Sequence, residues 1–86
     1  MVNKYVKRPV IIEAIEFDGS EESEKEIRDW SEGNVGKSAL TDELFVRTLE
    51  GFLKIQKGDF VIKGIKGEFY PCKPDIFYAT YDKVDG

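Results

Sequence analysis

The sequence predicts a small α+β domain in which two short helices pack on an antiparallel sheet, in the element order β-α-β-β-β-β-α. Three observations support this fold class. A β-branched apolar run lies near the N-terminus, a polar stretch with helix-capping residues follows it, and the second half alternates short apolar runs with glycine-containing turns. Because strands joined by short connections usually pair as neighbours, we expect one meander. The 86 residues are predicted to form a single domain over residues 1–86.

The first strand is predicted over residues 9–17, which read PVIIEAIEF. Valine and isoleucine favour strands because their branched side chains pack well on a pleated surface. Apolar side chains occupy positions 10, 12 and 14 on one face and positions 11, 15 and 17 on the other. We therefore expect a strand that is covered on both faces and that ends at Asp18-Gly19.

The first helix is predicted over residues 20–32, where acidic residues occupy the first turn. Ser20 is one candidate N-cap, and Ser23 in a capping box with the glutamate three residues later is the other. The apolar stripe is thin, because only Ile27 and Trp30 share a face. Such a helix is stable only when those two side chains dock on the sheet. The glycine directly after it is a natural helix stop.

A loop and a hairpin are predicted next along the chain. Residues 34–41 show no apolar period and are expected to form a loop. Residues 44–49 and 52–56 are the two strands of the hairpin. Between them, Glu50-Gly51 is the predicted two-residue turn, with glycine where a positive φ is easiest.

Two further strands are expected over residues 60–63 and 68–73, after a turn at residues 57–59. Residues 64–67 form the tight connection between them. Pro71 lies within the second of these strands and cannot donate a ladder hydrogen bond. That strand is therefore predicted to lie at a sheet edge or to end there.

The second helix is predicted to open at Pro74 and Asp75. Proline is preorganised for the first helical position, and an aspartate suits the first turn. Phe77, Tyr81 and Val84 recur at the helical spacing i, i+4, i+7. We therefore expect a helix that reaches the C-terminal end and docks through this stripe.

The composition removes most catalytic and metal-binding classes. With no His and one Cys, the chain has no Ser–His–Asp triad, no Cys–His pair and no set of Cys and His ligands for zinc. We predict no catalytic residue, no metal site and no cofactor. The single Cys excludes an internal disulfide, which fits a reducing cytosol. No apolar run is long enough for a signal peptide or a membrane span, so we expect a cytoplasmic protein.

The charge distribution is uneven along the chain. Residues 1–12 carry three bases and no acid, whereas residues 13–32 carry nine acids and two bases, which gives +3 and −7. The remaining residues balance, and the whole chain has a net charge of −4. A negative balance disfavours general nucleic-acid binding, which needs a basic face. The acidic segment is interpreted as a solvated helix face, with mimicry of a polyanion as the alternative.

The richest polar cluster in the sequence is the corner between the last strand and the last helix. Tyr70, Cys72, Lys73 and Asp75 supply a phenol, a thiol, an ammonium and a carboxylate within six residues. A helix N-terminus beside Lys73 would favour a phosphate or carboxylate and lower the pKa of Cys72. The alternative is structural: two prolines set a corner, Tyr70 packs, and Cys72 fills an apolar space.

A second hypothesis is that exposed aromatic rings form a stacking surface beside a basic side chain, an arrangement that suits a nucleotide. Arg47 or Lys73 would supply the base, and Tyr78 is the best exposed aromatic candidate because it lies off the predicted stripe. The alternative is that the aromatic residues are core. The predicted ligand-binding residues are Tyr70, Lys73, Asp75, Arg47 and Tyr78.

Two segments carry a resemblance to a known family. Residues 8–19, RPVIIEAIEFDG, and residues 58–77, GDFVIKGIKGEFYPCKPDIF, together with Thr80-Tyr81, resemble a family of small proteins encoded by phages and prophages. The second segment is the more specific. The resemblance implies a phage or prophage origin and a setting in the host cytoplasm. It implies no activity and no site residue.

The sequence therefore favours a non-enzymatic phage accessory protein that binds a host protein or associates with itself. Catalysis needs a positioned acid, base or nucleophile, and few such groups are available here. A homodimer through an edge strand or an aromatic patch is one expected form. Two alternatives stay open: a small-molecule binder that sequesters an anionic metabolite or nucleotide, and an enzyme that uses the carboxylates at positions 13, 16, 18, 21 and 22.

Overall fold

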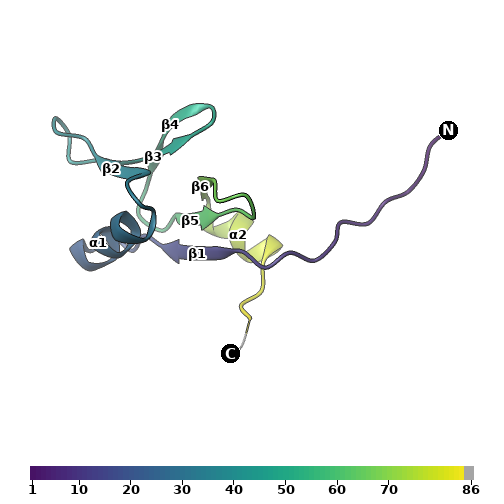
Figure 1. Cartoon of the computed structure of the whole chain (residues 1–86). Coiled ribbons are helices and arrows are strands. Elements are labelled where there is room, and N and C mark those ends of the chain that lie inside the picture. Colours follow the sequence, from purple (N-terminus) through teal and green to yellow (C-terminus); the bar gives the residue numbers. More distant parts are fainter. Residues whose placement is uncertain (85–86) are drawn as a thin grey trace.

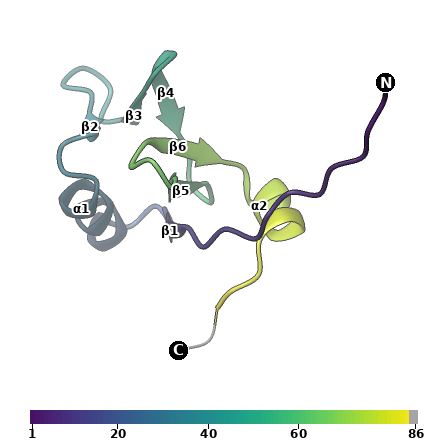
Figure 2. The ribbon, with the colours of Figure 1, turned by 45° about the vertical axis from the view of Figure 1, so that its right-hand side comes forward.

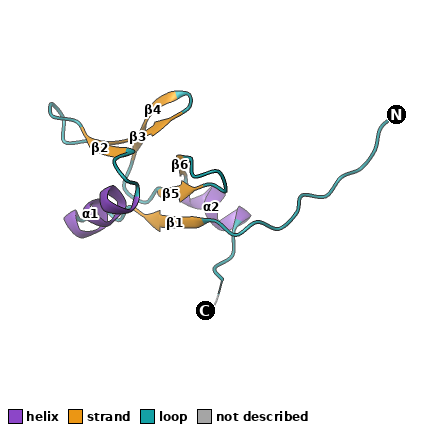
Figure 3. Cartoon of the chain, viewed as in Figure 1, coloured by secondary structure: helices purple, strands orange, loops and turns teal. Residues whose placement is uncertain are grey.

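The computed structural model describes residues 1–84, and in them two three-stranded antiparallel sheets stand in place of the single predicted meander (Figure 1). The elements are β1 (Glu13–Glu16), α1 (Glu21–Trp30), β2 (Val35–Lys37), β3 (Leu44–Thr48), β4 (Gly51–Ile55), β5 (Phe60–Lys63), β6 (Phe69–Cys72) and α2 (Pro74–Thr80). The strand orders are β1-β5-β6 and β2-β3-β4. The predicted α+β class is confirmed, with one strand more than expected (Figure 3).

The additional strand is β2, which occupies part of the predicted loop at residues 34–41. Val35 pairs with Val46 and is 3% exposed, while Gly36 and Lys37 continue the ladder. The backbone N–H of Arg47 donates to the carbonyl of Asn34 at 2.7 Å. The loop prediction was wrong because β2 has no apolar period of its own and forms by pairing with β3.

The first strand is shorter than predicted, because its partner ends. In the ladder, Glu13 pairs with Lys63 and Glu16 pairs with Phe60. Strand β5 stops at Lys63, so residues 9–12 extend beyond the sheet. Val10 and Ile11 are 42% and 79% exposed. The expectation of a strand covered on both faces from residue 9 was therefore wrong for its first four residues.

The turn of the β3–β4 hairpin lies one residue earlier than predicted. Thr48 pairs with Gly51, which makes Leu49 and Glu50 the turn residues. Gly51 has φ +111 and begins β4. The hydroxyl of Thr48 donates to the carbonyl of Gly51 at 2.8 Å and accepts from the N–H of Glu50 at 3.1 Å. These two hydrogen bonds of the Thr48 hydroxyl stabilise the turn at Leu49-Glu50, one residue before the predicted position.

The main core lies among α1, β1 and the facing strands of both sheets. Its buried members are Ile27, Val35, Leu44, Val46, Ile55, Val61 and Phe69. Ile27 is fully buried, and Trp30 packs edge-to-face on Phe69 with ring centroids 5.1 Å apart. The indole N–H of Trp30 also donates to Glu13 at 3.0 Å. The predicted docking of α1 through Ile27 and Trp30 is confirmed.

The N-terminus of α1 has the first of the two predicted caps. The hydroxyl of Ser20 accepts from the N–H of Ser23 at 3.1 Å. Asp18 supports this cap, since its carboxylate accepts from the N–H of Ser20 and the hydroxyl of Ser23, both at 2.8 Å. The helix ends at Trp30 with Ser31 as its C-cap, two residues before the predicted glycine, and Glu32 takes a positive φ of 54.

Stability should respond to acid through Asp18. Hydrogen bonds from Ser20, and then from Ser23, lower the pKa of Asp18 to about 2. The folded state therefore favours the charged carboxylate more than the unfolded state does, and this contribution is fully present above about pH 4. The difference in unfolding free energy between wild type and Asp18→Asn, measured by urea unfolding, should shrink as pH falls from about 4 to 2. A difference that does not change with pH would contradict this role.

Helix α2 begins at Pro74, as predicted, but it is short. It ends at Thr80, and Tyr81 is extended with φ −124 and ψ 143. The ring of Phe77 stacks on Phe60 with centroids 3.8 Å apart, and Tyr81 lies 5.1 Å from Phe77. Val84 is 63% exposed. The predicted stripe is thus correct for Phe77, whereas Tyr81 packs on Phe77 from beyond the helix, and the predicted extension of the helix to Val84 was wrong.

An N-terminal arm (residues 1–12) runs away from both sheets and leaves them beside α2 (Figures 1 and 2). It raises the radius of gyration to 14.5 Å. A compact domain of this length has a radius of about 12 Å. Among residues 1–84, no helix is both long and apolar enough to cross a membrane.

Candidate functional site

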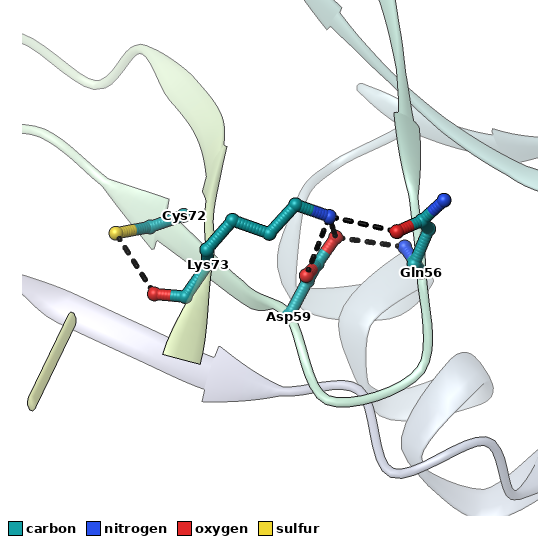
Figure 4. Close-up of polar contacts among 4 residues, drawn as sticks. All are labelled: Gln56, Asp59, Cys72 and Lys73. Atoms are coloured by element: carbon teal, nitrogen blue, oxygen red, sulfur yellow. Dashed lines mark hydrogen bonds and ion pairs between the residues drawn. The ribbon is translucent and has the colours of Figure 1, made fainter. Parts of the chain in front are cut away.

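The predicted polar corner lies where β6 enters α2, and Lys73 is its central residue (Figure 4). The ammonium of Lys73 contacts the carboxylate of Asp59 at 3.2 and 3.3 Å and donates to the side-chain oxygen of Gln56 at 2.8 Å. Asp59 is only 2% exposed, and it also accepts from the backbone N–H of Gln56 at 2.8 Å. Lys73 therefore joins the β4–β5 turn to the start of α2.

These contacts weaken the hypothesis of an anion site at the corner. The charge of Lys73 is already paired with Asp59, so an anionic ligand would have to compete with a buried carboxylate. Helix α2 has only seven residues, and its first turn carries Asp75, which repels an anion. The sequence did not reveal this pair, because Asp59 lies 14 residues before Lys73.

Cys72 is a poor nucleophile in this setting. Burial raises the pKa of its thiol, and the negative charges of Asp59 and Asp75 raise it further. The thiol lies 3.6 Å from the carbonyl of Lys73. The expectation that Lys73 and the helix N-terminus lower the pKa of Cys72 was wrong, since the ammonium is turned to Asp59 and two carboxylates lie near.

Alkylation should report the raised pKa of Cys72. Because the thiolate is the reactive form, iodoacetamide at pH 7.5 should modify Cys72 more slowly than it modifies free glutathione. Unfolding the chain in urea should remove this protection. Mass spectrometry of timed samples measures both rates. Labelling of the folded protein as fast as that of glutathione would contradict a raised pKa for this half-buried thiol.

Tyr70 packs at the corner, as the structural alternative expects. Burial raises its pKa to about 12, with further contributions from a hydrogen bond with Tyr81 and from the charge of Glu68. Tyr70 lies on β6 opposite Ile62. The phenol therefore stays neutral at ordinary pH and fills the space between β6 and the end of α2.

The other two predicted ligand-binding residues lie apart. Arg47 is on β3, in the second sheet, opposite Phe52. Tyr78 is on α2 and is 65% exposed, as predicted. Its ring contacts Phe60 edge-to-face at 5.4 Å. Of the two candidate bases for the aromatic stacking surface, Arg47 lies in the other sheet from β5 and β6, and Lys73 is paired with Asp59.

An apolar groove of about 530 Å³ lies between the first strand and α2, and sequence analysis missed it. Its walls are residues 10–12, 14 and 16 on one side and residues 77, 78 and 81–84 on the other, with Phe60 between them. The sequence pattern predicted that both faces of residues 9–17 are covered. The early end of α2 leaves this face open instead.

An acidic groove of about 450 Å³ lies on the other side of β1, against the start of α1. Four carboxylates line it, those of Glu16, Asp18, Glu22 and Glu26. Across residues 1–84, no three acidic or thiol side chains gather in a way that could hold a metal ion. The groove is therefore a strongly negative surface beside a sheet edge.

Comparisons of the chain with protein families, with curated proteins and with solved structures found no match. The resemblance of residues 8–19 and 58–77 to phage and prophage proteins stays a prediction. The two grooves and the edge of β1 between them are the features from which a function can be proposed.

Proposed function

We propose that the protein acts by binding other protein chains, and that the apolar groove is its binding surface. The supporting observation is a cluster of exposed apolar side chains along this groove. Ile11, Tyr78 and Val84 are 79%, 65% and 63% exposed, and all three line the same cavity. An exposed apolar patch with a polar rim is typical of a protein interaction site.

A protein partner suits the groove better than a small anion does. Small-molecule sites combine an apolar pocket with a few polar groups that converge on the ligand. Here the charged lining residues are Glu16, Asp82 and Lys83, and the other lining side chains are aromatic or aliphatic. The one lysine of the predicted anion site, Lys73, is held by Asp59.

The setting of this activity follows from the sequence resemblance. Residues 8–19 and 58–77 support a phage or prophage origin and action in the host cytoplasm. On this proposal the partner is a host protein or a second copy of the chain. Neither role requires a catalytic residue.

Photocrosslinking in the host cell tests the proposal. With Tyr78 replaced by a photoreactive phenylalanine analogue, we expect discrete covalent adducts with protein. The matched control is the same replacement of Leu49, which is 100% exposed at the tip of the β3–β4 hairpin and lies outside the groove. Ile11→Asp should remove the adducts, because it places a carboxylate in the apolar lining of the groove. Absence of adducts at Tyr78, or equal adducts at both positions, would contradict the proposal.

A further inference from the structure

The outer edge of β1 and the N-terminal arm are unpaired in the structure. Across residues 1–84, β1 is hydrogen-bonded to β5 alone, so its other edge is open. The arm lies in no sheet, and Val2, Tyr5 and Val6 are 98%, 89% and 92% exposed on it. An open edge accepts an extended segment through backbone hydrogen bonds, and an apolar extended segment is stabilised by such an edge.

The hydrogen-bonding directions of β1 follow from one backbone contact. The N–H of Phe17 donates to the carbonyl of Asp59 at 2.8 Å, on the β5 side. Because peptide groups alternate along a strand, those of Glu13 and Ile15 also face β5, and those of Ala14 and the other even-numbered residues face the open edge. Pro9 is odd-numbered, so its missing N–H falls on the side away from an added strand.

We propose that a second copy of the chain occupies this edge, with the two β1 strands antiparallel about a two-fold axis at Ile12. The inference rests on the proposed function and names its partner. The pairing places Val10 opposite Ala14 and Arg8 opposite Glu16 of the other copy. Apolar residues then face apolar residues and a base faces an acid, which are the favourable cross-strand pairs. The β1-β5-β6 sheets of the two copies join into one sheet of six strands.

Charge selects this register over its neighbours. Moving the axis by one residue also keeps even-numbered residues opposite even-numbered residues, and so keeps the hydrogen-bonding directions. An axis at Glu13 places Val10 opposite Glu16, and an axis at Ile11 places Val6 opposite Glu16 and Arg8 opposite Ala14. The axis at Ile12 keeps Val10 opposite an apolar residue and Arg8 opposite an acid, and its one apolar–carboxylate pair, Val6 with Asp18, lies beyond the end of β1.

The remaining part of the arm carries basic residues, and the surface of the second copy that it reaches is acidic. Beyond Arg8, the arm runs toward its own N-terminus past the end of the partner's β1, where the acidic groove begins. Lys4 and Lys7 thereby approach the carboxylates of Asp18, Glu22 and Glu26, which line that groove. The arm carries three bases and no acid, and the segment that receives it has a charge of −7. Such complementarity sets the direction and register of an interface.

The apolar groove lies on the same side of the paired strands. Val10, Ile12 and Ala14 are even-numbered and line this groove in each copy. In the dimer, Val10 of one copy lies against Ala14 of the other, so the two grooves meet across the axis. A single interface thus covers the open edge, the arm and part of the exposed apolar surface.

A charge swap tests the pairing in the intact protein. Sedimentation equilibrium at low salt should show dimers of the wild-type chain, and Arg8→Glu or Glu16→Arg alone should raise the dissociation constant about tenfold or more, because each dimer then contains two like-charge pairs. Mixing the two variants in equal amounts should restore dimers, since every pair in the mixed dimer is complementary. Circular dichroism and melting temperature show that each variant folds.

Crosslinking gives a second measurement that does not depend on charge. On a Cys72→Ser background, Ile12→Cys should form an intermolecular disulfide on mild oxidation, because paired residues at the axis have Cα atoms about 5.5 Å apart. Leu49→Cys is the matched control and should not crosslink.

Several results would overturn the dimer. The first is a wild-type chain that stays monomeric up to roughly millimolar concentration. The second is a charge variant that dimerises as well as the wild type, or a mixture of the two variants that stays monomeric. The third is equal crosslinking at Ile12 and Leu49. If the wild-type chain is monomeric while Tyr78 still gives photoadducts with another protein, the dimer fails and the proposed function stands. If dimers form but Tyr78 gives no adduct, the proposed groove function fails instead.

Discussion

Replacing Ile27 with Ala is expected to lower the free energy of unfolding by about 2–5 kcal/mol. Ile27 is 0% exposed and is the buried residue of α1. A ten-residue helix with a polar surface is not stable by itself, so it depends on this contact with the core. Urea unfolding followed by the fluorescence of Trp30, the single tryptophan, measures the loss.

Arg28→Ala is the matched control for this prediction. Arg28 is the neighbouring residue on α1, is exposed and lies outside the acidic groove, so its replacement should change stability by less than about 0.5 kcal/mol. Small domains have a total stability of about 5–15 kcal/mol, so the Ile27 variant would lose a large part of it. A loss below about 1 kcal/mol for Ile27→Ala would contradict the docking of α1 through this side chain.

Replacing Phe60 with Ala should cost about 3–5 kcal/mol. Phe60 is 9% exposed, and its ring lies parallel to that of Phe77 at 3.8 Å with an interplanar angle of 3°. Helix α2 has no buried residue of its own, so this stack is its main attachment to the sheet. The variant should therefore release α2 and open the apolar groove as well as destabilise the fold.

Two measurements separate these effects. Urea unfolding gives the loss of stability, and nuclear magnetic resonance of Ile76 and Tyr78 should show the loss of ordered α2 before global unfolding. Phe52→Ala is the matched control, because Phe52 is 71% exposed on β4 and should cost less than about 0.5 kcal/mol. Retention of an ordered α2 in the Phe60 variant would show that the stack does not attach the helix.

Local chemistry in the sequence was enough to predict several elements. Ser20 caps α1 because a hydroxyl at that position reaches the third N–H along the chain. Pro74 begins α2 because proline has a helical φ and needs no hydrogen bond there. Pro71 marks β6 as an edge strand, which the strand order confirms. Each of these predictions depends on residues only a few positions apart.

The candidate sites needed the tertiary structure, since their parts are distant in sequence. The corner contained the right residues, but Asp59 and Gln56 decide what Lys73 does. The apolar groove forms because α2 stops early and β5 ends at Lys63, and neither event is visible in residues 9–17.

Residue patterns alone predicted the α+β class, the start of α2 at Pro74 and the central hairpin, and they narrowed the start of α1 and the place of β6 to two alternatives each. The packing of the whole chain was needed to choose between those alternatives, to make Val35–Lys37 a strand, to divide the strands into two sheets, and to leave residues 1–12 outside them. The physical reason is that caps, prolines and turns act through bonds to near neighbours. Strand pairing and the filling of a groove depend instead on where a distant partner ends.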